Sequence, residues 1–223
     1  VPKSMQIDFG RGLSGGFSAE IEANASELSP RYTLIEIEGI KIAPSPDHAQ
    51  RFLRSIGCAP INNVVDATNY VLHELGQPLH AFDADKIKGE LRVRLASKSE
   101  KITTLDGEKR ELSDSDLVIA DSNEAMCIAG VFGSEKHGVS NGTTRILLES
   151  AFFNPVSVRK SAKRHGLSTD ASFRFEREVD PNLIKDAGER AAKLICEWSG
   201  GSVVGATELG ETGISPGYKV DLE

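Results

Sequence analysis

The residues of this chain that could do chemistry begin in one stretch, Asp66–Asp83, which reads DATNYVLHELGQPLHAFD. Apolar residues recur at helical spacing from Val64 onward, so we predict an amphipathic helix that ends at Gly76, before Pro78. His80 then follows on a turn, where packing alone does not require a histidine. Because an unperturbed imidazole titrates near pH ~6.5, His80 could orient or deprotonate a water molecule.

Four further groups of small or polar residues could converge with His80. They are Thr68-Asn69 on the predicted helix, Ala129-Gly130 after an apolar strand, Glu149 at the end of the apolar strand RILLE, and Thr169-Asp170-Ala171 in a loop between two helices. A glycine after a strand lets another group approach the backbone closely, and loops often carry functional residues. We therefore take these groups as candidates for one site.

Each candidate also has an ordinary structural explanation. His80 could be a surface or core histidine, and Glu149 could be an exposed carboxylate at a strand end or helix start. Thr68 and Asn69 could hydrogen-bond to nearby backbone, and Asp170 could cap a turn. The spacing of the residues leaves both explanations open.

Three helices are predicted from a shared device, a capping side chain followed by proline at the first helical position. The three starts are Ser45-Pro46, Asn154-Pro155 and Asp180-Pro181. We expect these helices to end at Gly57, Gly166 and Gly200. The third carries an apolar stripe that includes Trp198, which we interpret as core.

Short strands are predicted between the early and late helices. They cover Tyr32–Ile40, Leu91–Leu95, Ile102–Leu105, Leu117–Ala120, Cys127–Phe132 and Ile146–Leu148, with a hairpin turn at Asp106-Gly107. A block of strands between groups of helices favours an α+β fold over a doubly wound sheet. We expect a single α+β domain whose β-sandwich-like strand core, of unusual topology, is flanked by helices. The sequence has no GxxxxGK[ST] or GxGxxG loop for phosphate binding.

The composition narrows the class of protein. At 223 residues, 39% hydrophobic and 26% charged, the chain is an ordinary globular protein. It has no run of 18 apolar residues and no signal-peptide pattern, so we expect a cytoplasmic protein with no membrane partner. Cys58, Cys127 and Cys196 stand alone without a CxxC pair, which indicates reduced thiols and no metal site.

The net charge of −7 argues against a protein that binds nucleic acid over its whole surface. It still permits one local contact. A basic cluster lies on one predicted helix and consists of Arg159, Lys160, Lys163 and Arg164. These side chains could bind RNA phosphates and release their counterions, or they could simply form a solvated helix face.

Four motifs, in one order, resemble the central domain of the bacterial phenylalanyl-tRNA synthetase beta subunit. They are the Asp66–Asp83 stretch, CIAGVFG (Cys127–Gly133), LLESAFFNP (Leu147–Pro155) and HGLSTDASFRFEREVDP (His165–Pro181). The match covers residues 30–208, so the resemblance implies a domain there, with an N-terminal connector over 1–29 and a C-terminal connector over 209–223 to a missing domain. The chain departs from the family at Glu178 and Ser134, where glycine is common.

The resemblance implies an editing site, which hydrolyses tyrosine mistakenly esterified to tRNA(Phe). The site residues carried over by motif are His80, Thr68, Asn69 and Thr169 for catalysis, and Glu149, Ala129, Gly130 and Ala171 for substrate binding. Glu149 would accept a hydrogen bond from the phenol hydroxyl, while the small residues leave room for the ring. Ser150 and Ser172 lack a GxSxG-like elbow, so a covalent route is not expected.

The same resemblance implies the partners. These would be the aminoacyl 3′ end of tRNA(Phe), tyrosine as editing ligand, and the alpha subunit in the complete heterotetramer. No cofactor is expected in this fragment, while ATP and magnesium would serve amino-acid activation in the complete synthetase. Two alternatives remain, namely a non-catalytic structural or RNA-docking module with an inactive pocket, and a free-standing hydrolase of small aromatic esters or amides.

Overall fold

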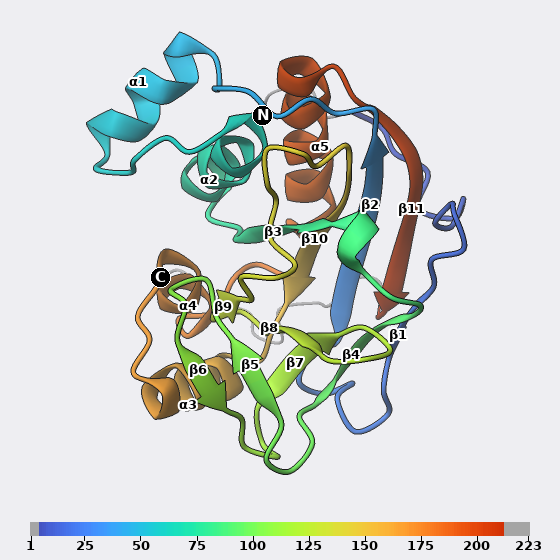
Figure 1. The fold of residues 1–223 in the computed structure, drawn as a ribbon, viewed down its shortest axis with the longest axis vertical. Coiled ribbons are helices and arrows are strands. Elements are labelled where there is room, and N and C mark those ends of the chain that lie inside the picture. The colour runs from blue at the N-terminus through green and yellow to red at the C-terminus, as the bar shows by residue number, and fades with distance from the viewer. Residues whose placement is uncertain (1–4, 212–223) are drawn as a thin grey trace, which may run out of the picture.

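The computed structural model describes residues 5–211, which form a single α+β domain with two packed sheets and flanking helices, as expected (Figure 1). The strands are β1 (Ala19–Ile21), β2 (Arg31–Glu38), β3 (Leu79–Asp83), β4 (Leu91–Leu95), β5 (Lys101–Thr103), β6 (Lys109–Glu111), β7 (Leu117–Ala120), β8 (Ala125–Ile128), β9 (Phe132–Gly133), β10 (Arg145–Phe152) and β11 (Ser202–Gly210). The α-helices are α1 (Asp47–Ser55), α2 (Asn63–Leu75), α3 (Pro155–His165), α4 (Asp170–Phe175) and α5 (Ile184–Ser199).

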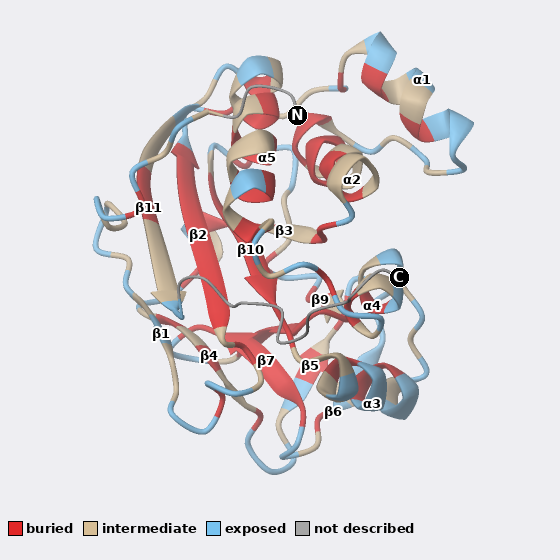
Figure 2. Cartoon of the chain, turned by 180° about the vertical axis from the view of Figure 1, so that it is seen from behind, coloured by how far each residue is buried: buried red, intermediate tan, exposed pale blue. Residues whose placement is uncertain are grey.

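Two larger sheets make up the strand core. One has the order β11-β2-β10-β3, and the other has the order β1-β4-β7-β8-β9, with β5 and β6 forming a separate hairpin. The first sheet packs one face against α5, and β2 and β10 are buried along nearly their whole lengths (Figure 2). The candidate site lies on the other face of this sheet.

Alternation along β10 divides its side chains between two hydrophobic clusters, because successive residues of a strand point to opposite faces. Ile146 and Leu148 pack in the cluster that contains residues of α2 and α5. Leu147 and Ala151 pack in the cluster shared with the second sheet. Glu149 lies between these last two in the alternation, so a carboxylate occupies a core-facing position.

Two local signals were predicted correctly, the end of α2 at Gly76 and the cap of α3 by Asn154. The side chain of Asn62 accepts hydrogen bonds at the start of α2, and Gly76 ends that helix in the left-handed conformation with φ 78°. The Asn154 side chain likewise caps α3, and Pro155 occupies its first turn. In both cases the partners are only two or three residues away, within reach of a sequence argument.

The other two predicted caps are wrong. Ser45 does not cap α1, because its hydroxyl donates to the buried carboxylate of Asp66 instead. Asp180 closes a short turn by accepting from the backbone N–H of Asn182 at 2.8 Å, and α5 begins only at Ile184. A distant carboxylate competes for Ser45 and a local turn competes for Asp180, and the sequence pattern shows neither competition.

The predicted strand Cys127–Phe132 is in fact a tight reversal. β8 ends at Ile128, and β9 returns antiparallel to it from Phe132. Gly130 lies at the turn with φ +68°, a conformation that favours glycine. The Val131 N–H donates to the Ile128 carbonyl at 2.9 Å and closes the turn.

The segment before residue 30 packs on the domain. β1 pairs parallel to β4, Phe9 is buried, and Gly12 forms an isolated bridge with Ala206 of β11. β11 runs to Gly210, and residues 212–223 of the expected C-terminal connector lie outside the described residues. Within residues 5–211 no helix is both long and apolar enough to span a bilayer.

Candidate active site

The sheet wall of the site is formed by two strand residues that face each other. His80 on β3 and Glu149 on β10 are direct partners in the antiparallel register, so their side chains lie on the same face of the sheet. This corrects two expectations, since His80 is on a strand rather than a turn and Glu149 lies inside its strand rather than at the end. β10 continues beyond Glu149 because it pairs with β2 on one side and β3 on the other.

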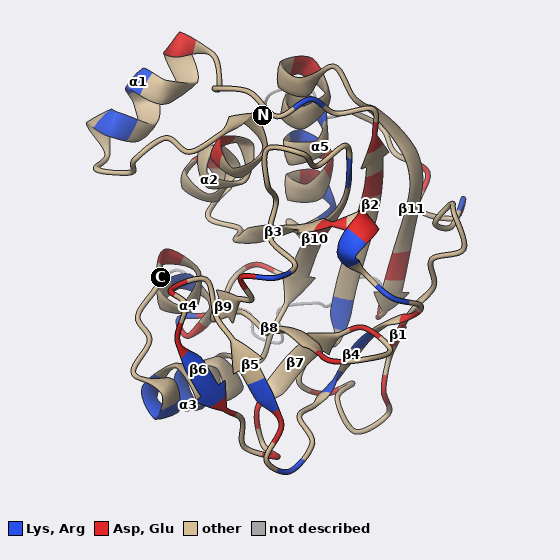
Figure 3. Cartoon of the chain, in the orientation of Figure 1, with Lys and Arg blue, Asp and Glu red and all other residues tan. Residues whose placement is uncertain are grey.

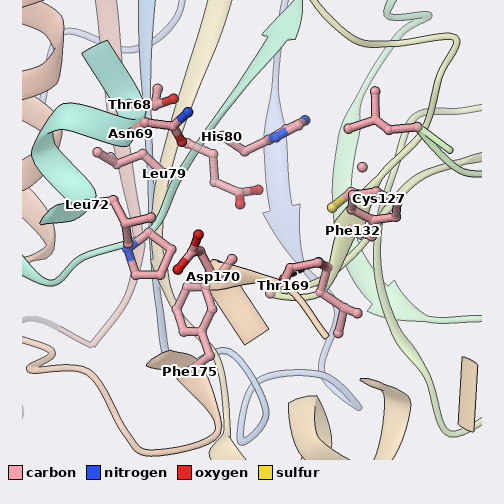
Figure 4. A pocket seen from close by; sticks show the side chains of 17 residues that line it. Thr68, Asn69, Leu72, Leu79, His80, Cys127, Phe132, Thr169, Asp170 and Phe175 are labelled. Carbon is pink, nitrogen blue, oxygen red and sulfur yellow. Dashed lines mark hydrogen bonds between the residues drawn. The ribbon is translucent and has the colours of Figure 1, made fainter. Parts of the chain in front are cut away.

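A cavity of about 220 Å³ lies beside this pair (Figure 4). It is enclosed by residues of α2, β3, the β8–β9 region, β10 and α4. The predicted site residues that line it are Thr68, Asn69, His80, Gly130, Glu149, Thr169 and Ala171. The predicted residue Ala129 does not line it; Ala129 is buried, and its backbone N–H donates to the Leu117 carbonyl at 2.9 Å. A volume below the roughly 300–1,000 Å³ of drug-sized sites suits a ligand of amino-acid size.

Glu149 is buried, with 5% of the residue exposed, and a buried tyrosine contacts its carboxylate. The hydroxyl of Tyr32 on β2 donates to Glu149 Oε2 at 2.7 Å. Burial raises the pKa of Glu149 to about 7, and the hydrogen bond from Tyr32 acts in the opposite direction. Sequence reasoning missed Tyr32, and alternation along β2 is the signal that points its side chain toward the second sheet.

The His80 ring is half-buried beside the cavity. Desolvation by burial lowers its pKa to about 4, so the imidazole is neutral at physiological pH. The ring meets Phe82 edge to face, with centroids 4.5 Å apart. It also packs on the backbone of Gly133, where a Cβ atom would lie only 2.8 Å from His80 Cε1. Gly133 is therefore a second residue that sequence reasoning missed, although it is part of the CIAGVFG motif.

Two predicted hydroxyl groups already donate to backbone. Thr68 Oγ1 donates to the Val65 carbonyl at 2.8 Å, which is the local alternative raised from the sequence. Thr169 caps α4, where its Oγ1 accepts from the Ser172 N–H, and it also donates to the Val131 carbonyl at 3.0 Å. Both residues line the cavity, and a hydroxyl oxygen that donates its proton keeps lone pairs for a further donor.

The small residues of the site differ in what they do. A Cβ atom on Gly130 would lie 3.0 Å from both Phe175 Cδ2 and Val158 Cγ2, so close packing and the φ of +68° both favour glycine there. Ala171 was expected in a loop but lies half-buried in the first turn of α4, because Thr169 caps a helix that begins at Asp170, and it lines the cavity. Asp170 precedes it as an exposed carboxylate that lines the cavity (Figure 4). Its Oδ1 pairs with Arg174 at 2.9 Å.

Cys127 also lines the cavity, but its thiol is unreactive. Burial raises the pKa of this thiol well above its usual range, with a smaller effect from the nearby Glu149. The thiol is therefore protonated and is a poor nucleophile. Among residues 5–211 no group of three His, Cys, Asp or Glu side chains is placed to hold a metal ion.

The basic residues predicted on one helix lie on α3 (Figure 3), which packs against α4 and β7. Arg159, Lys160 and Lys163 are exposed. Arg164 instead pairs with the buried carboxylate of Asp116, so part of its charge is engaged within the protein.

The chain is similar in sequence to phenylalanine–tRNA ligase beta subunits. Over 185 residues it is 49% identical to the phenylalanine–tRNA ligase beta subunit of Bacteroides fragilis, covering 82% of this chain and 23% of that protein. Over 204 residues it is 48% identical to the same subunit of Anaeromyxobacter dehalogenans, covering 91% and 25%. The chain thus spans about a quarter of the length of these relatives.

A solved N-terminal fragment of the phenylalanyl-tRNA synthetase beta subunit from Pyrococcus horikoshii has a TM-score of 0.48 and 15% identity, and covers 73% of this chain and 53% of that one. That likeness is too slight to support an argument. The B3/4 domain family matches residues 28–200, which include every helix and strand that lines the cavity. On the strength of that match, this chain belongs to the B3/4 domain family.

Proposed function

We propose that this chain is part of a phenylalanine–tRNA ligase beta subunit, and that its cavity hydrolyses tyrosine wrongly esterified to tRNA(Phe). The observation that carries the proposal is the position of Glu149 and His80, directly opposite each other on neighbouring strands and bordering one cavity of amino-acid size. The high identity to ligase beta subunits supports the choice of substrate.

Selection of tyrosine would depend on Glu149. An apolar pocket rejects an added hydroxyl by only about 10²-fold, so a synthetase needs a second site that requires the hydroxyl. A phenol donating to a carboxylate gains about 1.5–3 kcal/mol. Phenylalanine would displace water from Glu149 without giving it a donor, so the correct product would be refused.

Hydrolysis would depend on a water molecule placed by His80. With its pKa near 4, the neutral ring is a weak base, and so we assign it to orienting the water rather than to removing its proton. Thr68 and Thr169 donate their protons to backbone carbonyls and can accept from a ribose hydroxyl or from the water. The Asn69 amide would supply a donor to the ester oxygen, where negative charge develops.

The tRNA would be held partly by α3. Arg159, Lys160 and Lys163 present exposed charge there, and Arg164 adds to it although it also pairs with Asp116. Such charges bind phosphates with an affinity that falls as salt rises. The alpha subunit, ATP and magnesium would belong to amino-acid activation in the complete ligase.

The test is deacylation of Tyr-tRNA(Phe) by a complete ligase whose beta subunit contains this chain. Glu149→Ala and His80→Ala should each lose deacylation by 10²-fold or more, about the effect of removing one catalytic group, while aminoacylation with phenylalanine is retained. Glu27→Ala and His48→Ala change exposed residues outside the cavity and serve as matched controls.

Two outcomes would redirect the proposal. Unchanged turnover in both cavity variants would favour the alternative of a non-catalytic module that docks RNA through α3. Turnover of small aromatic esters together with indifference to tRNA would favour a free-standing hydrolase. Titration with free tyrosine and phenylalanine tests the cavity separately, because tyrosine should bind more tightly and Glu149→Ala should abolish the difference.

A further inference from the structure

We propose that Tyr32 is a positioning residue for tyrosine recognition, whose hydroxyl holds one oxygen of the Glu149 carboxylate so that the other is presented to the phenol of the ligand. This inference rests on the proposed function and deepens it. Tyr32 is fully buried, so packing alone would make it a core residue. The inference adds a role in substrate specificity.

The register of three strands places Tyr32 beside the carboxylate. On β10, Glu149 stands opposite Leu34 of β2 on one side and His80 of β3 on the other. Tyr32 lies two residues before Leu34, so it points to the same face and meets Glu149 diagonally. It is fully buried and does not line the cavity. Tyr32 therefore contacts Glu149 from outside the cavity, on the side away from His80.

The bond between them has the chemistry proposed for the ligand. The Tyr32 phenol donates to Glu149 Oε2 at 2.7 Å, within the usual range for an O–H···O bond. A carboxylate has two oxygens and can accept several hydrogen bonds. A tyrosine in the cavity would add a second phenol to the same carboxylate. Because Tyr32 already fixes the carboxylate, the ligand does not have to order it.

Among the described residues no cation lies beside the Glu149 carboxylate, so the hydrogen bond from Tyr32 is important for keeping it ionised. The ionisable groups that face the carboxylate are Tyr32 from β2, His80 from β3 and Cys127 from β8, and Asp170 of α4 lines the same cavity. None of them is a cation at neutral pH, since His80 has a pKa near 4. Burial raises the pKa of Glu149 to about 7, and the Tyr32 hydrogen bond opposes that rise. Without the hydroxyl, less of Glu149 would be ionised at pH 7.

The inference is tested by calorimetric titration of this chain with tyrosine and with phenylalanine between pH 5.5 and 9. Wild-type affinity for tyrosine should rise with pH through about 7, as Glu149 ionises. Tyr32→Phe should lose about tenfold in tyrosine affinity at pH 7, and the midpoint of its pH profile should move upward. Phenylalanine binding should stay as in the wild type.

Tyr70→Phe is the matched control. Tyr70 packs against Phe52 and Trp198 away from the cavity, so removing its hydroxyl should leave both tyrosine affinity and the midpoint unchanged. Wild-type affinity and midpoint in Tyr32→Phe, together with lost preference in Glu149→Ala, would overturn the role of Tyr32 and leave the proposed function standing. A wild-type protein that binds both amino acids equally would overturn both.

A second experiment covers the case in which Tyr32→Phe does not fold. The sequence contains three tyrosines, and biosynthetic replacement by 3-fluorotyrosine makes their phenols more acidic with little change in size. A stronger donor from position 32 should move the midpoint of tyrosine binding to lower pH. An unchanged midpoint in the fluorinated protein, with tyrosine preference retained, would overturn the inference.

Discussion

The two faces of the β11-β2-β10-β3 sheet are built from the same strands but differ in the polar side chains that β10 buries on them. Toward α5, the one polar side chain of β10 is Ser150, whose hydroxyl donates to the Ile184 carbonyl at 2.8 Å. Toward the second sheet, β10 carries Glu149 among apolar neighbours, where burial raises its pKa to about 7. The first face satisfies its polar group completely, while the second keeps a carboxylate where its charge is disfavoured.

This difference separates the part of the sheet that stabilises the fold from the part that is available for chemistry. A buried group whose pKa is displaced by desolvation, and which borders a cavity, is a candidate functional group. Proteins tolerate such a loss of stability where function needs it. The α5 face should therefore respond to substitution mainly in stability, and the cavity face mainly in ligand binding and turnover.

The largest effect should come from the α5 face. Leu148 is fully buried, so Leu148→Ala should lower the free energy of unfolding by about 2–5 kcal/mol through lost burial and a new cavity. Urea denaturation measures this change. In the fraction that stays folded, the preference for tyrosine over phenylalanine should persist. A loss below about 1 kcal/mol would mean that this face is not the stabilising one.

The second effect depends on pH and lies on the cavity face. The pKa of Glu149 is 4.5 in an unfolded chain and about 7 in the fold, so the folded state binds more protons between these values. Wild-type stability from this group therefore falls as pH rises from 4.5 to 7. Glu149→Gln cannot ionise, so it should gain about 3 kcal/mol on the wild type between pH 4.5 and 8.

Urea denaturation of both proteins across this pH range measures the gain. His80 has its pKa lowered from 6.5 to about 4, so its contribution is lost as pH falls through that window. Because His80 is present in both proteins, it cancels in their difference. Tyr-tRNA(Phe) deacylation should be lost in Glu149→Gln at every pH. A stability difference that does not vary with pH would show that Glu149 is not held in an apolar setting.

A third substitution, at Gly133, should change both stability and deacylation. A methyl group there would crowd the His80 ring, so Gly133→Ala should displace the ring and cost about 1–3 kcal/mol of stability. Deacylation should fall more than binding of free tyrosine, because the ring is proposed to place water. Gly142→Ala is the matched control, since a Cβ atom at Gly142 meets no other atom within 4 Å. Equal deacylation by the two variants would argue against a role for the ring.

The smallest effect should be that of Ser150→Ala. It removes the hydroxyl that donates to Ile184 and should cost about 1 kcal/mol in thermal or urea unfolding. Deacylation should be unchanged because Ser150 points to the α5 face. Loss of turnover in a folded Ser150→Ala protein would make that hydroxyl a nucleophile and reverse the assignment of the two faces.

Sequence reasoning succeeded where the interactions are short in range. The end of α2 at Gly76, the cap of α3 by Asn154 and the hairpin turn at Asp106-Gly107 all depend on residues within a few positions of one another. The α+β class followed from the grouping of helices around strands, and the structure confirms it. Local backbone preferences were enough for these elements.

Sequence reasoning failed where a distant strand decides the outcome. His80 was expected on a turn and Glu149 at a strand end, but pairing of β10 with both β2 and β3 draws both residues into the sheet. Ser45 was expected as a helix cap, but its hydroxyl donates a hydrogen bond to the buried Asp66 carboxylate instead. Each of these outcomes depends on a partner that local periodicity cannot identify.

By itself, then, the sequence determined the types of residue available to the site and two of the elements that carry them, α2 and the first part of β10, because capping, turns and periodicity act over a few residues. Only the tertiary structure decided that Glu149 and His80 share a cavity, that Tyr32 holds the carboxylate, and that Gly133 makes room for the ring. The physical reason is strand pairing, which sets register between segments far apart in the chain and so chooses which side chains meet.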